Sequence, residues 1–409
     1  MTKAIDCLIK IENDYSCKLY NSILDVNLDD WKQVCQTSDS NVYMDIGFLL
    51  TIEKTMAGFS KFWYVIFYDQ NGNPSACTSL STFKADLGVV ASKGTKEFIT
   101  HVRRLLPSFL YLNVLFCGLP ISIGKNHLIF VENANQELII KLLDSIMNTI
   151  AAKEKTKLII YKEFNSQECN QLDALLQLNY LKAESLPMHS FKAKFANFSE
   201  YCAALKSHYR NDIKRSKRKF EKAGLRVVQL KDTEKILQIY TPEMHQLYEA
   251  VVQKSENQLE TLPITFFREL AIYFSGQLLF TLVYKDDKIV AFNCSLCTQS
   301  SVHYLFCRLD YSLNAESDLY FNLMYAALDE ALKQNVSKID FGQTADTFKA
   351  RLGSYQTPLY MYIKGTEFLL NWIIRKSFNI LFPNPVLVPS YNIYKQYPIA
   401  AKYLINISQ

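Results

Sequence analysis

The densest group of chemically useful side chains is a run of cations. Nine Lys and Arg residues lie within positions 206–226, against only two acidic residues. Apolar residues recur there at helical spacing, so one face can pack on the protein while the basic face meets solvent. Such a face is either simply solvated or contacts the phosphates of a nucleotide-bearing donor, an RNA or a phosphorylated acceptor. We expect Arg210 and Lys214 to reach inward. The candidate donor-phosphate contacts are Arg210, Lys214, Lys217 and Arg218.

A second polar group stands at the end of an apolar strand pattern and in the segment after it. Asp340 belongs to the strand, and Gln343, Lys349 and Arg351 follow. Folds of the α/β type place ligand contacts at such strand ends. Lys349 can bring positive charge to an oxyanion or a phosphate, so Lys349 and Asp340 are the candidate catalytic residues, with Gln343 and Arg351 as substrate contacts. The structural alternatives are a surface lysine at 349 and, for Asp340, a capping role or an ion pair with Arg351.

Further candidates are scattered along the chain. Amide formation needs a neutral amine, so a carboxylate or a histidine near the acceptor would help by taking a proton. His303 stands beside Tyr304 in an apolar strand pattern, and Asn293 interrupts another. A lone histidine can equally be packed, and Asn293 can face solvent by alternation. The other candidate substrate contacts are Tyr320, Lys162 and Glu163. No catalytic triad or metal-ligand set is visible, so we expect no bound metal and no bound cofactor.

These residues must be positioned by a mixed pattern of strands and helices that occurs twice. In the first half, strands are expected at 62–68 and 75–80, around a turn rich in Asn, Gly and Pro. In the second half, strands are expected at 278–284 and 289–297, around a charged turn. Each pair predicts a hairpin, which suggests two similarly built lobes.

Periodicity and capping residues predict the elements around the hairpins. In the first half, Asn27 can cap a helix, and a long helix at 136–153 leads to a strand at 157–161. The second hairpin is followed by a strand at 302–309, a helix at 318–334, a strand at 338–341 and a helix near Asp346.

Three segments together resemble a known superfamily. Residues 339–353 read IDFGQTADTFKARLG, residues 207–224 form the basic run, and residues 286–291 read DDKIVA. The chain resembles the GNAT superfamily of acyltransferases, in its two-lobed Fem-like branch, over about residues 25–365. The resemblance implies an α/β (α+β) fold of two GNAT-like lobes, each a mixed, mostly antiparallel sheet flanked by helices.

The expected domains follow this layout. Residues 1–190 form the N-terminal GNAT-like lobe, residues 191–365 the C-terminal acyltransferase lobe, and residues 366–409 an apolar tail that packs on the lobes. Within the tail, residues 368–382 read FLLNWIIRKSFNILF. This stretch must be covered, either by packing between the lobes or by peripheral contact with a membrane.

The resemblance implies an N-acyltransferase that moves an acyl group from acyl-CoA or a carrier thioester to an amine of a small molecule or peptide. Two features depart from the CoA-binding pattern. Residues 310–319, DYSLNAESDL, hold no glycine where a pyrophosphate loop is expected, and no tyrosine stands near 348–349 to act as the superfamily's general acid. Two alternatives stay open: Fem-type transfer from aminoacyl-tRNA, and a non-catalytic binding protein with the same fold.

Composition sets the outer bounds. With 409 residues, 49% of them hydrophobic, the chain should fold throughout into two or more domains. A net charge of +5 is too small to mark the whole chain as nucleic-acid-binding. Residues 1–13 show no signal-peptide pattern, and no apolar run reaches the roughly 18 residues of a membrane span. We therefore expect a cytoplasmic protein.

Overall fold

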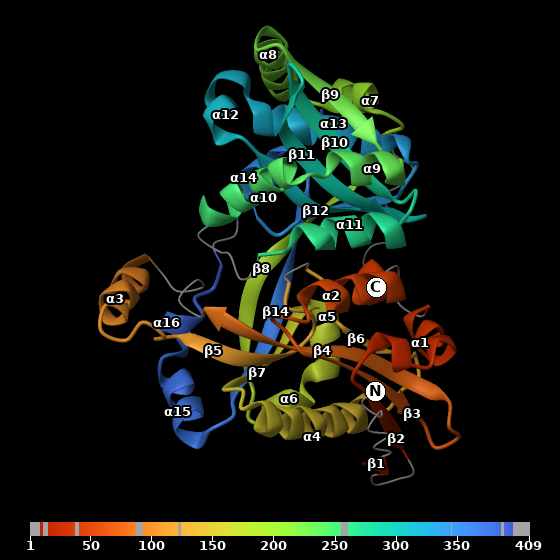
Figure 1. Cartoon of the computed structure of the whole chain (residues 1–409), viewed down its shortest axis with the longest axis vertical. Coiled ribbons are helices and arrows are strands. Elements are labelled where there is room, and N and C mark those ends of the chain that lie inside the picture. The colour runs from red at the N-terminus through yellow and green to blue at the C-terminus, as the bar shows by residue number, and fades with distance from the viewer. Residues whose placement is uncertain are drawn as a thin grey trace.

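A single sheet runs through the described chain. The computed structural model describes residues 9–10, 15–36, 41–86, 93–121, 124–254, 261–344, 346–385 and 388–395. Residues 1–8 and 11–14, which cover most of the segment without a signal-peptide pattern, lie outside these ranges. The strand order is β1-β2-β3-β4-β5-β7-β14-β8-β13-β12-β11-β10-β9, with β6 paired to β4 (Figure 1).

The strands are β1 (Ile9–Lys10), β2 (Ser16–Tyr20), β3 (Phe62–Tyr68), β4 (Pro74–Asp86), β5 (Tyr111–Cys117), β6 (Leu128–Phe130), β7 (Leu158–Asn165), β8 (Leu181–Lys192), β9 (Leu225–Leu230), β10 (Leu278–Lys285), β11 (Lys288–Cys297), β12 (Ser301–Leu309), β13 (Lys338–Gly342) and β14 (Tyr355–Gly365). The helices are α1 (Leu28–Cys35), α2 (Ile46–Met56), α3 (Lys93–Arg103), α4 (Gln136–Glu154), α5 (Ser166–Cys169), α6 (Ala174–Gln177), α7 (Phe198–Ala204), α8 (Ser207–Lys222), α9 (Thr233–Ile239), α10 (Pro242–Lys254), α11 (Ile264–Tyr273), α12 (Tyr311–Ser317), α13 (Leu319–Lys333), α14 (Asp346–Arg351), α15 (Phe368–Lys376) and α16 (Phe378–Leu381).

The same element order occurs twice. In the N-terminal half, β2, β3, β4 and β5 are followed by α4, β7, α6 and β8, and in the C-terminal half β9, β10, β11 and β12 are followed by α13, β13, α14 and β14. The first four strands of each set pair antiparallel, whereas β5 with β7 and β12 with β13 pair parallel. The predicted fold class is confirmed: a mixed, mostly antiparallel sheet flanked by helices.

The two halves exchange their last strands. Strand β8 of the N-terminal half pairs with β13, while β14 of the C-terminal half pairs with β7. The exchanged strands also pair with each other, and Figure 1 shows them running through the middle of the molecule. A boundary at residue 190 falls inside β8, so the division into residues 1–190 and 191–365 stays a prediction for units that share one sheet.

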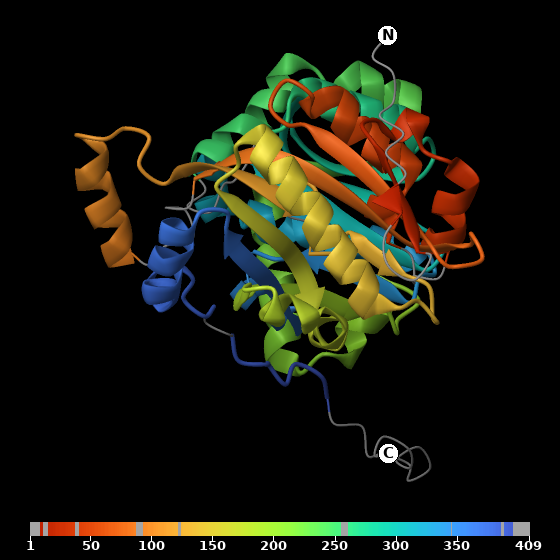
Figure 2. The same cartoon turned by 90° about the horizontal axis from the view of Figure 1, so that it is seen from below.

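A shared core also joins the halves. One cluster of buried apolar residues combines Tyr43 and Phe48 of the N-terminal half with Phe266, Phe280 and Phe292 of the C-terminal half. Helices α2 and α11 meet over this cluster, where Phe48 and Phe266 are in edge contact at 6.4 Å. Helix α4 lies across the sheet of the N-terminal half above a separate core (Figure 2). The halves are therefore held together by packing as well as by strand exchange.

The expected local elements are confirmed where capping and period are strong. Asn27 caps α1 by accepting hydrogen bonds from the backbone amides of Asp29 and Asp30. Both hairpins form, with β3 against β4 and β10 against β11. Strand β4 is longer than expected, because it continues past the hairpin to Asp86 along β5.

The apolar C-terminal stretch forms α15 and α16. Ile374 and Phe382 pack in a cluster with residues of β4, β5, β7, β8 and β14, while other large side chains of α15 remain exposed. No helix within the described ranges is both long and apolar enough to cross a bilayer.

Candidate active site

The C-terminal half places several candidate residues where the pairing of β12 and β13 ends. The two strands pair in parallel only from Ser301 opposite Lys338 to His303 opposite Asp340, and β12 then continues to Leu309 without β13. A bulge interrupts the register between β11 and β12 next to Tyr304. Bulges of this kind re-aim side chains and are frequent beside active sites.

Lys349 on α14 is buried at this position. The residue is 4% exposed, so the alternative of a surface lysine is wrong. A Cβ atom added to Gly342 would lie 3.7 Å from Nζ of Lys349 and 3.8 Å from the carbonyl oxygen of Tyr304. Gly342 has φ of 81°, a left-handed conformation that glycine adopts readily, and an added Cβ would be in ordinary van der Waals contact with Lys349. Burial raises the pKa of Cys307 to about 12, against the opposing charges of Arg308 and Lys349.

Two neighbouring polar groups have no hydrogen-bond partner among the described residues. They are Nδ2 of Asn293 and the hydroxyl of Tyr304, both buried. Asn293 is opposite Cys307 in the register of β11 and β12, and Ser295 donates to its Oδ1 at 2.5 Å. Asn293 therefore does not face solvent. Burial raises the pKa of Tyr304 well above its usual range, so this hydroxyl stays protonated. Buried polar atoms without partners are costly, and a ligand could satisfy them.

We call Asn293, Tyr304, Cys307 and Lys349 the Lys349 cluster. It combines β11, β12 and α14 at the point where β13 ends. Its composition is a buried cation with polar groups that do not titrate near neutral pH. Such a set can stabilise developing negative charge, but it offers no carboxylate or imidazole to take a proton.

His303 and Asp340 form a second buried group. Nε2 of His303 lies 2.8 Å from Oγ of Ser301, and Nδ1 lies 3.2 Å from Oδ2 of Asp340, in ion-pair range but not aligned as a hydrogen bond. Oγ of Ser190, on the exchanged strand β8, donates to Oδ1 of Asp340 at 2.6 Å. The imidazole ring meets Tyr43 edge-on at 5.7 Å, at the shared core. This group therefore lies at the junction of the halves.

Charges around Asp340 hold it ionised. Nζ of Lys338 lies 2.9 Å from Oδ1, and Nζ of Lys125 lies 3.9 Å from Oδ2. Burial favours the neutral acid, but the His303 imidazole and these two ammonium groups outweigh it and hold the pKa of Asp340 below its ordinary range. Asp340 does not pair with Arg351, so that structural alternative is wrong.

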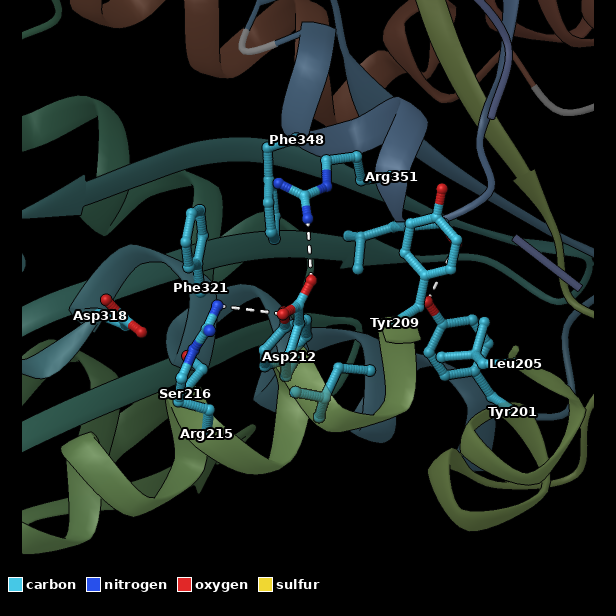
Figure 3. Close-up of a pocket in the computed structure, with 13 residues that line it drawn as sticks. Tyr201, Leu205, Tyr209, Asp212, Arg215, Ser216, Asp318, Phe321, Phe348 and Arg351 are labelled. Atoms are coloured by element: carbon cyan, nitrogen blue, oxygen red, sulfur yellow. Dashed lines mark hydrogen bonds and ion pairs between the residues drawn. The ribbon is translucent and has the colours of Figure 1, made fainter. Parts of the chain in front are cut away.

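A pocket opens beside the Lys349 cluster, between α7, α8, α13 and α14 (Figure 3). Its centre is Asp212 of α8, which binds Arg351 of α14 and Arg215, each at 3.0 Å. Phe348 stacks on Phe321 at 4.8 Å. The lining residues are Tyr201, Leu205, Tyr209, Asp212, Ile213, Arg215, Ser216, Asp318, Phe321, Tyr325, Phe348, Arg351 and Leu352. Because Phe348 and Lys349 are consecutive on α14, the pocket and the Lys349 cluster share that helix.

The basic helix α8 presents its cations mostly to solvent. Lys214, Lys217 and Arg218 are exposed, and the inward side carries Ile213 and other apolar residues. The expectation that Lys214 reaches inward is therefore wrong. Arg210 is partly buried, with its guanidinium 3.4 Å from the carbonyl oxygen of Leu205.

The N-terminus of α13 is already occupied by the chain's own groups. Oδ1 of Asn314 accepts a hydrogen bond from the backbone amide of Tyr320 at 2.8 Å. Asp318 precedes the helix and pairs with Lys219 of α8 at 3.0 Å. The side chain of Tyr320 packs 5.0 Å from the ring of Phe348. This helix start therefore carries a carboxylate where a pyrophosphate would need free amides.

The remaining candidates lie outside the Lys349 cluster. Lys162 and Glu163 are buried on β7 of the N-terminal half, and Nζ of Lys162 donates to the carbonyl oxygen of Ile121 at 2.5 Å. Gln343 donates to the carbonyl oxygen of Leu186 at 2.9 Å. The structure thus places Lys349 near Cys307 and the main chain of Tyr304, with Asn293 opposite Cys307, whereas His303 with Asp340 and Lys162 with Glu163 make other contacts.

Sequence reasoning missed Asp212, Phe321 and Ser190. In the sequence Asp212 is one of the two acidic residues of the basic run, and its position on the apolar side of α8 is the signal that it faces inward. Ser190 carried no signal, because its partner Asp340 is 150 residues away. Within the described ranges no group of three His, Cys, Asp or Glu residues is arranged to hold a metal ion.

The model of the FemAB-like family, described as peptidoglycan biosynthesis/recognition, matches residues 109–361. No curated protein sequence matches the chain significantly. A tandem GNAT protein from the clavulanic acid biosynthesis pathway is 9% identical, with a TM-score of 0.51 over 86% of this chain and 99% of its own.

Two further solved structures are similar at lower scores. FemX is 13% identical over 82% of this chain and 95% of its own, with a TM-score of 0.49. The C-terminal domain of a putative lysylphosphatidylglycerol synthetase from Agrobacterium fabrum is 10% identical over 89% of this chain and 100% of its own, with a TM-score of 0.48.

Proposed function

The chain belongs to the FemAB-like family, and on this premise we propose that it is a transferase that moves an aminoacyl group from tRNA to an amine of a peptide acceptor. The observation that carries this proposal is the buried ammonium of Lys349 in the same cluster as Asn293 and Tyr304, whose Nδ2 and hydroxyl have no hydrogen-bond partner among the described residues. The peptide acceptor follows from the family's description, and the donor from the electrostatics of α8 and α13.

In the proposed reaction the acceptor amine attacks the ester carbonyl carbon of the donor. A C–N bond forms, the C–O bond to the tRNA ribose breaks, the amine loses a proton and the ribose oxygen gains one. Negative charge develops on the carbonyl oxygen in the transition state, and Lys349 would stabilise it. The hydroxyl of Tyr304 and Nδ2 of Asn293 can donate hydrogen bonds to the bound group.

Asp340 has a different proposed role. Its carboxylate lies among Ser190, His303, Lys338 and Lys125, and the imidazole and the two ammonium groups lower its pKa, so it is a weak base for a substrate proton. We propose that Asp340 and His303 position β13 and the exchanged β8, and that they act on the reaction only through the placement of Gly342 and Lys349.

Two parts of the C-terminal half, the start of α13 and the exposed side of α8, bear on the identity of the donor. Asn314 and Asp318 occupy the start of α13, which disfavours a CoA pyrophosphate there. Helix α8 instead offers exposed cations beside the pocket, and several cations along one helix suit a polyphosphate chain such as tRNA. A tRNA donor would place the reaction in the cytoplasm. An acyl thioester is the second candidate, because the tandem GNAT fold is shared.

A donor screen tests the proposal. We expect a charged tRNA to raise the melting temperature and acetyl-CoA to leave it unchanged, because a ligand stabilises the state that it binds. A charged tRNA with a labelled amino acid should then transfer label to a peptide carrying a free amine. The matched control is Lys349→Met, which should bind the tRNA and transfer little label. Transfer from acetyl-CoA would favour the thioester, and binding without any transfer would favour a non-catalytic binding protein.

A further inference from the structure

Helix α15 exposes the face that a helix of a water-soluble protein normally buries. Phe368 is 89% exposed, and Leu369, Trp372 and Ile373 are also exposed. Their spacing of i, i+1, i+4 and i+5 places them on one side of the helix. The opposite side is anchored, since Ile374 is buried and Leu370 packs against the sheet of the N-terminal half.

A second exposed apolar site lies on the same side of the molecule. Leu105 and Leu106 follow α3 and are 86% and 60% exposed. Both Figure 1 and Figure 2 show α3 and the pair α15 and α16 on the same side. Leu112 of β5 packs in the same apolar cluster as Ile374 of α15. The segment after α3 and helix α15 are therefore both anchored on this cluster, although they are far apart in sequence. We call Leu105, Leu106, Phe368, Leu369, Trp372 and Ile373 the apolar side.

Cations flank the apolar side. Arg375 and Lys376 lie in the last turn of α15 and are exposed, and Arg104 adjoins Leu105. Residues 93–111 hold four Lys and Arg against one acidic residue, and one of the four, Arg103, is paired with Asp86 of β4. The acidic Glu367 at the start of α15 is already paired with Lys157 at 2.5 Å. The charges that remain are therefore mainly positive.

We propose that the apolar side docks on the surface of an anionic lipid bilayer. The match is in the chemistry: projecting aliphatic and aromatic side chains enter the acyl boundary, a tryptophan sits at the interface, and cations meet anionic headgroups. None of these helices spans the bilayer, so the contact is peripheral. This inference does not depend on the proposed transfer reaction, because it uses none of its residues.

Tryptophan fluorescence offers a direct readout. The chain has three tryptophans, and Trp31 and Trp63 are buried whereas Trp372 is 52% exposed. When full-length protein is mixed with vesicles of phosphatidylglycerol and phosphatidylcholine, the emission should shift to shorter wavelength and the protein should float with the vesicles. Trp372→Phe should remove the spectral shift and keep the flotation, since phenylalanine remains apolar.

Variants separate the apolar and the charged contributions. Phe368→Ser with Trp372→Ser should weaken vesicle binding more than about tenfold. Arg375→Gln with Lys376→Gln should weaken binding about fivefold per cation on anionic vesicles and little on pure phosphatidylcholine.

The matched control is Leu24→Ser with Phe59→Ser, which removes two exposed apolar side chains from elsewhere on the N-terminal half and should leave vesicle binding unchanged. The circular dichroism of each variant should match that of the unmodified chain, because the replaced side chains are exposed.

Three outcomes would overturn the proposal. The first is no flotation with anionic vesicles, and the second is equal loss of binding in the control and in the Phe368 and Trp372 variant. The third is a dimer in light scattering that this variant converts to a monomer, which would show that a second copy of the chain covers the apolar side.

Discussion

The two halves of the molecule differ most at one position. In both halves a short helix, α6 or α14, is followed two positions after its last residue by a residue with positive φ, Asn179 or Gly353, and the exchanged strand begins two positions later. Four residues before the residue with positive φ stand Leu175 in the N-terminal half and Lys349 in the C-terminal half. Both side chains are buried. One half thus keeps an apolar contact where the other holds a cation.

A second difference, within the described residues, is that a basic helix precedes the sheet of the C-terminal half only. The C-terminal half is preceded by α8, whose outward side is basic, and the described part of the N-terminal half has no counterpart. The repeated sheet supplies two similar frameworks, and the charges distinguish them. We infer that the N-terminal half keeps the fold while the C-terminal half carries the reaction.

The largest expected effect comes from making the C-terminal half resemble the N-terminal one at this position. Lys349→Met keeps the volume and removes the charge, so turnover should fall by about 100-fold to 1000-fold, as for the loss of one oxyanion donor. Stability should be unchanged or higher, because a buried charge is replaced by an apolar side chain. Single-turnover kinetics and thermal unfolding check both parts. Turnover within threefold of the unmodified protein would remove Lys349 from the site.

The reverse change should harm the N-terminal half. Leu175→Lys places an ammonium among the buried apolar residues of the N-terminal core. We therefore expect a loss of roughly 3 kcal/mol in the free energy of unfolding. The adjacent Leu176 is 46% exposed, so Leu176→Lys should change stability by less than about 0.5 kcal/mol. Urea denaturation of both variants measures the difference. If Leu175→Lys lowered the free energy of unfolding as little as Leu176→Lys, the buried site would tolerate a cation, and the contrast between Leu175 and Lys349 would carry no meaning.

Lowering the pH should destabilise the folded protein through protonation of Asp340 at the junction of the halves. Its pKa is depressed in the folded protein, so its stabilising contribution is present above the unfolded pKa of about 4 and is lost as pH falls below that value. Asp340→Asn should cost about 2 kcal/mol at pH 7 and flatten the loss of stability below pH 4. Asp329→Asn, at an exposed pair with Lys333, is the control. An unchanged acid profile in Asp340→Asn would exclude this carboxylate as the source.

The smallest effect is expected at the pocket. Arg351 and Asp212 are 44% and 22% exposed, so Arg351→Gln should cost less than about 1 kcal/mol of stability, and the loss should shrink in high salt. Thermal unfolding at low and high salt checks this. A cost well above that value would mean that the ion pair holds α8 to α14 structurally, which would separate the pocket from any role in the donor site.

Much of the framework was predictable because its signals are local. The Asn27 cap, the turn between β3 and β4 and the period of α4 each act over a few residues. The repeated hairpins correctly predicted a repeated layout. The exchange of β8 and β14 was not predictable, because strand partners leave no mark in the alternation of either strand.

The site was predictable only in part, because its residues are brought together by contacts between segments that are distant in sequence. Lys349 could be predicted from a motif, but its burial next to the end of β13 and the main chain of Tyr304 comes from contacts between segments distant in sequence. Asp340 was selected, whereas its partners Ser190 and His303 come from distant strands. The outward orientation of Lys214 follows from the apolar stripe of α8, whose inward side carries Ile213 and Phe220.

The salt dependence of tRNA binding tests the donor, and with it the claim that the C-terminal half holds the reaction. We expect the logarithm of affinity for a charged tRNA to fall steeply with the logarithm of salt, by about 0.7 to 0.9 per phosphate contacted. Replacing Lys214, Lys217 and Arg218 by Gln should reduce this slope by about two to three. Replacing Lys141, Lys153 and Lys155, exposed cations of α4 and its end in the N-terminal half, should leave the slope unchanged. Equal slopes for all three proteins, or tight binding of acetyl-CoA in place of tRNA, would contradict the account.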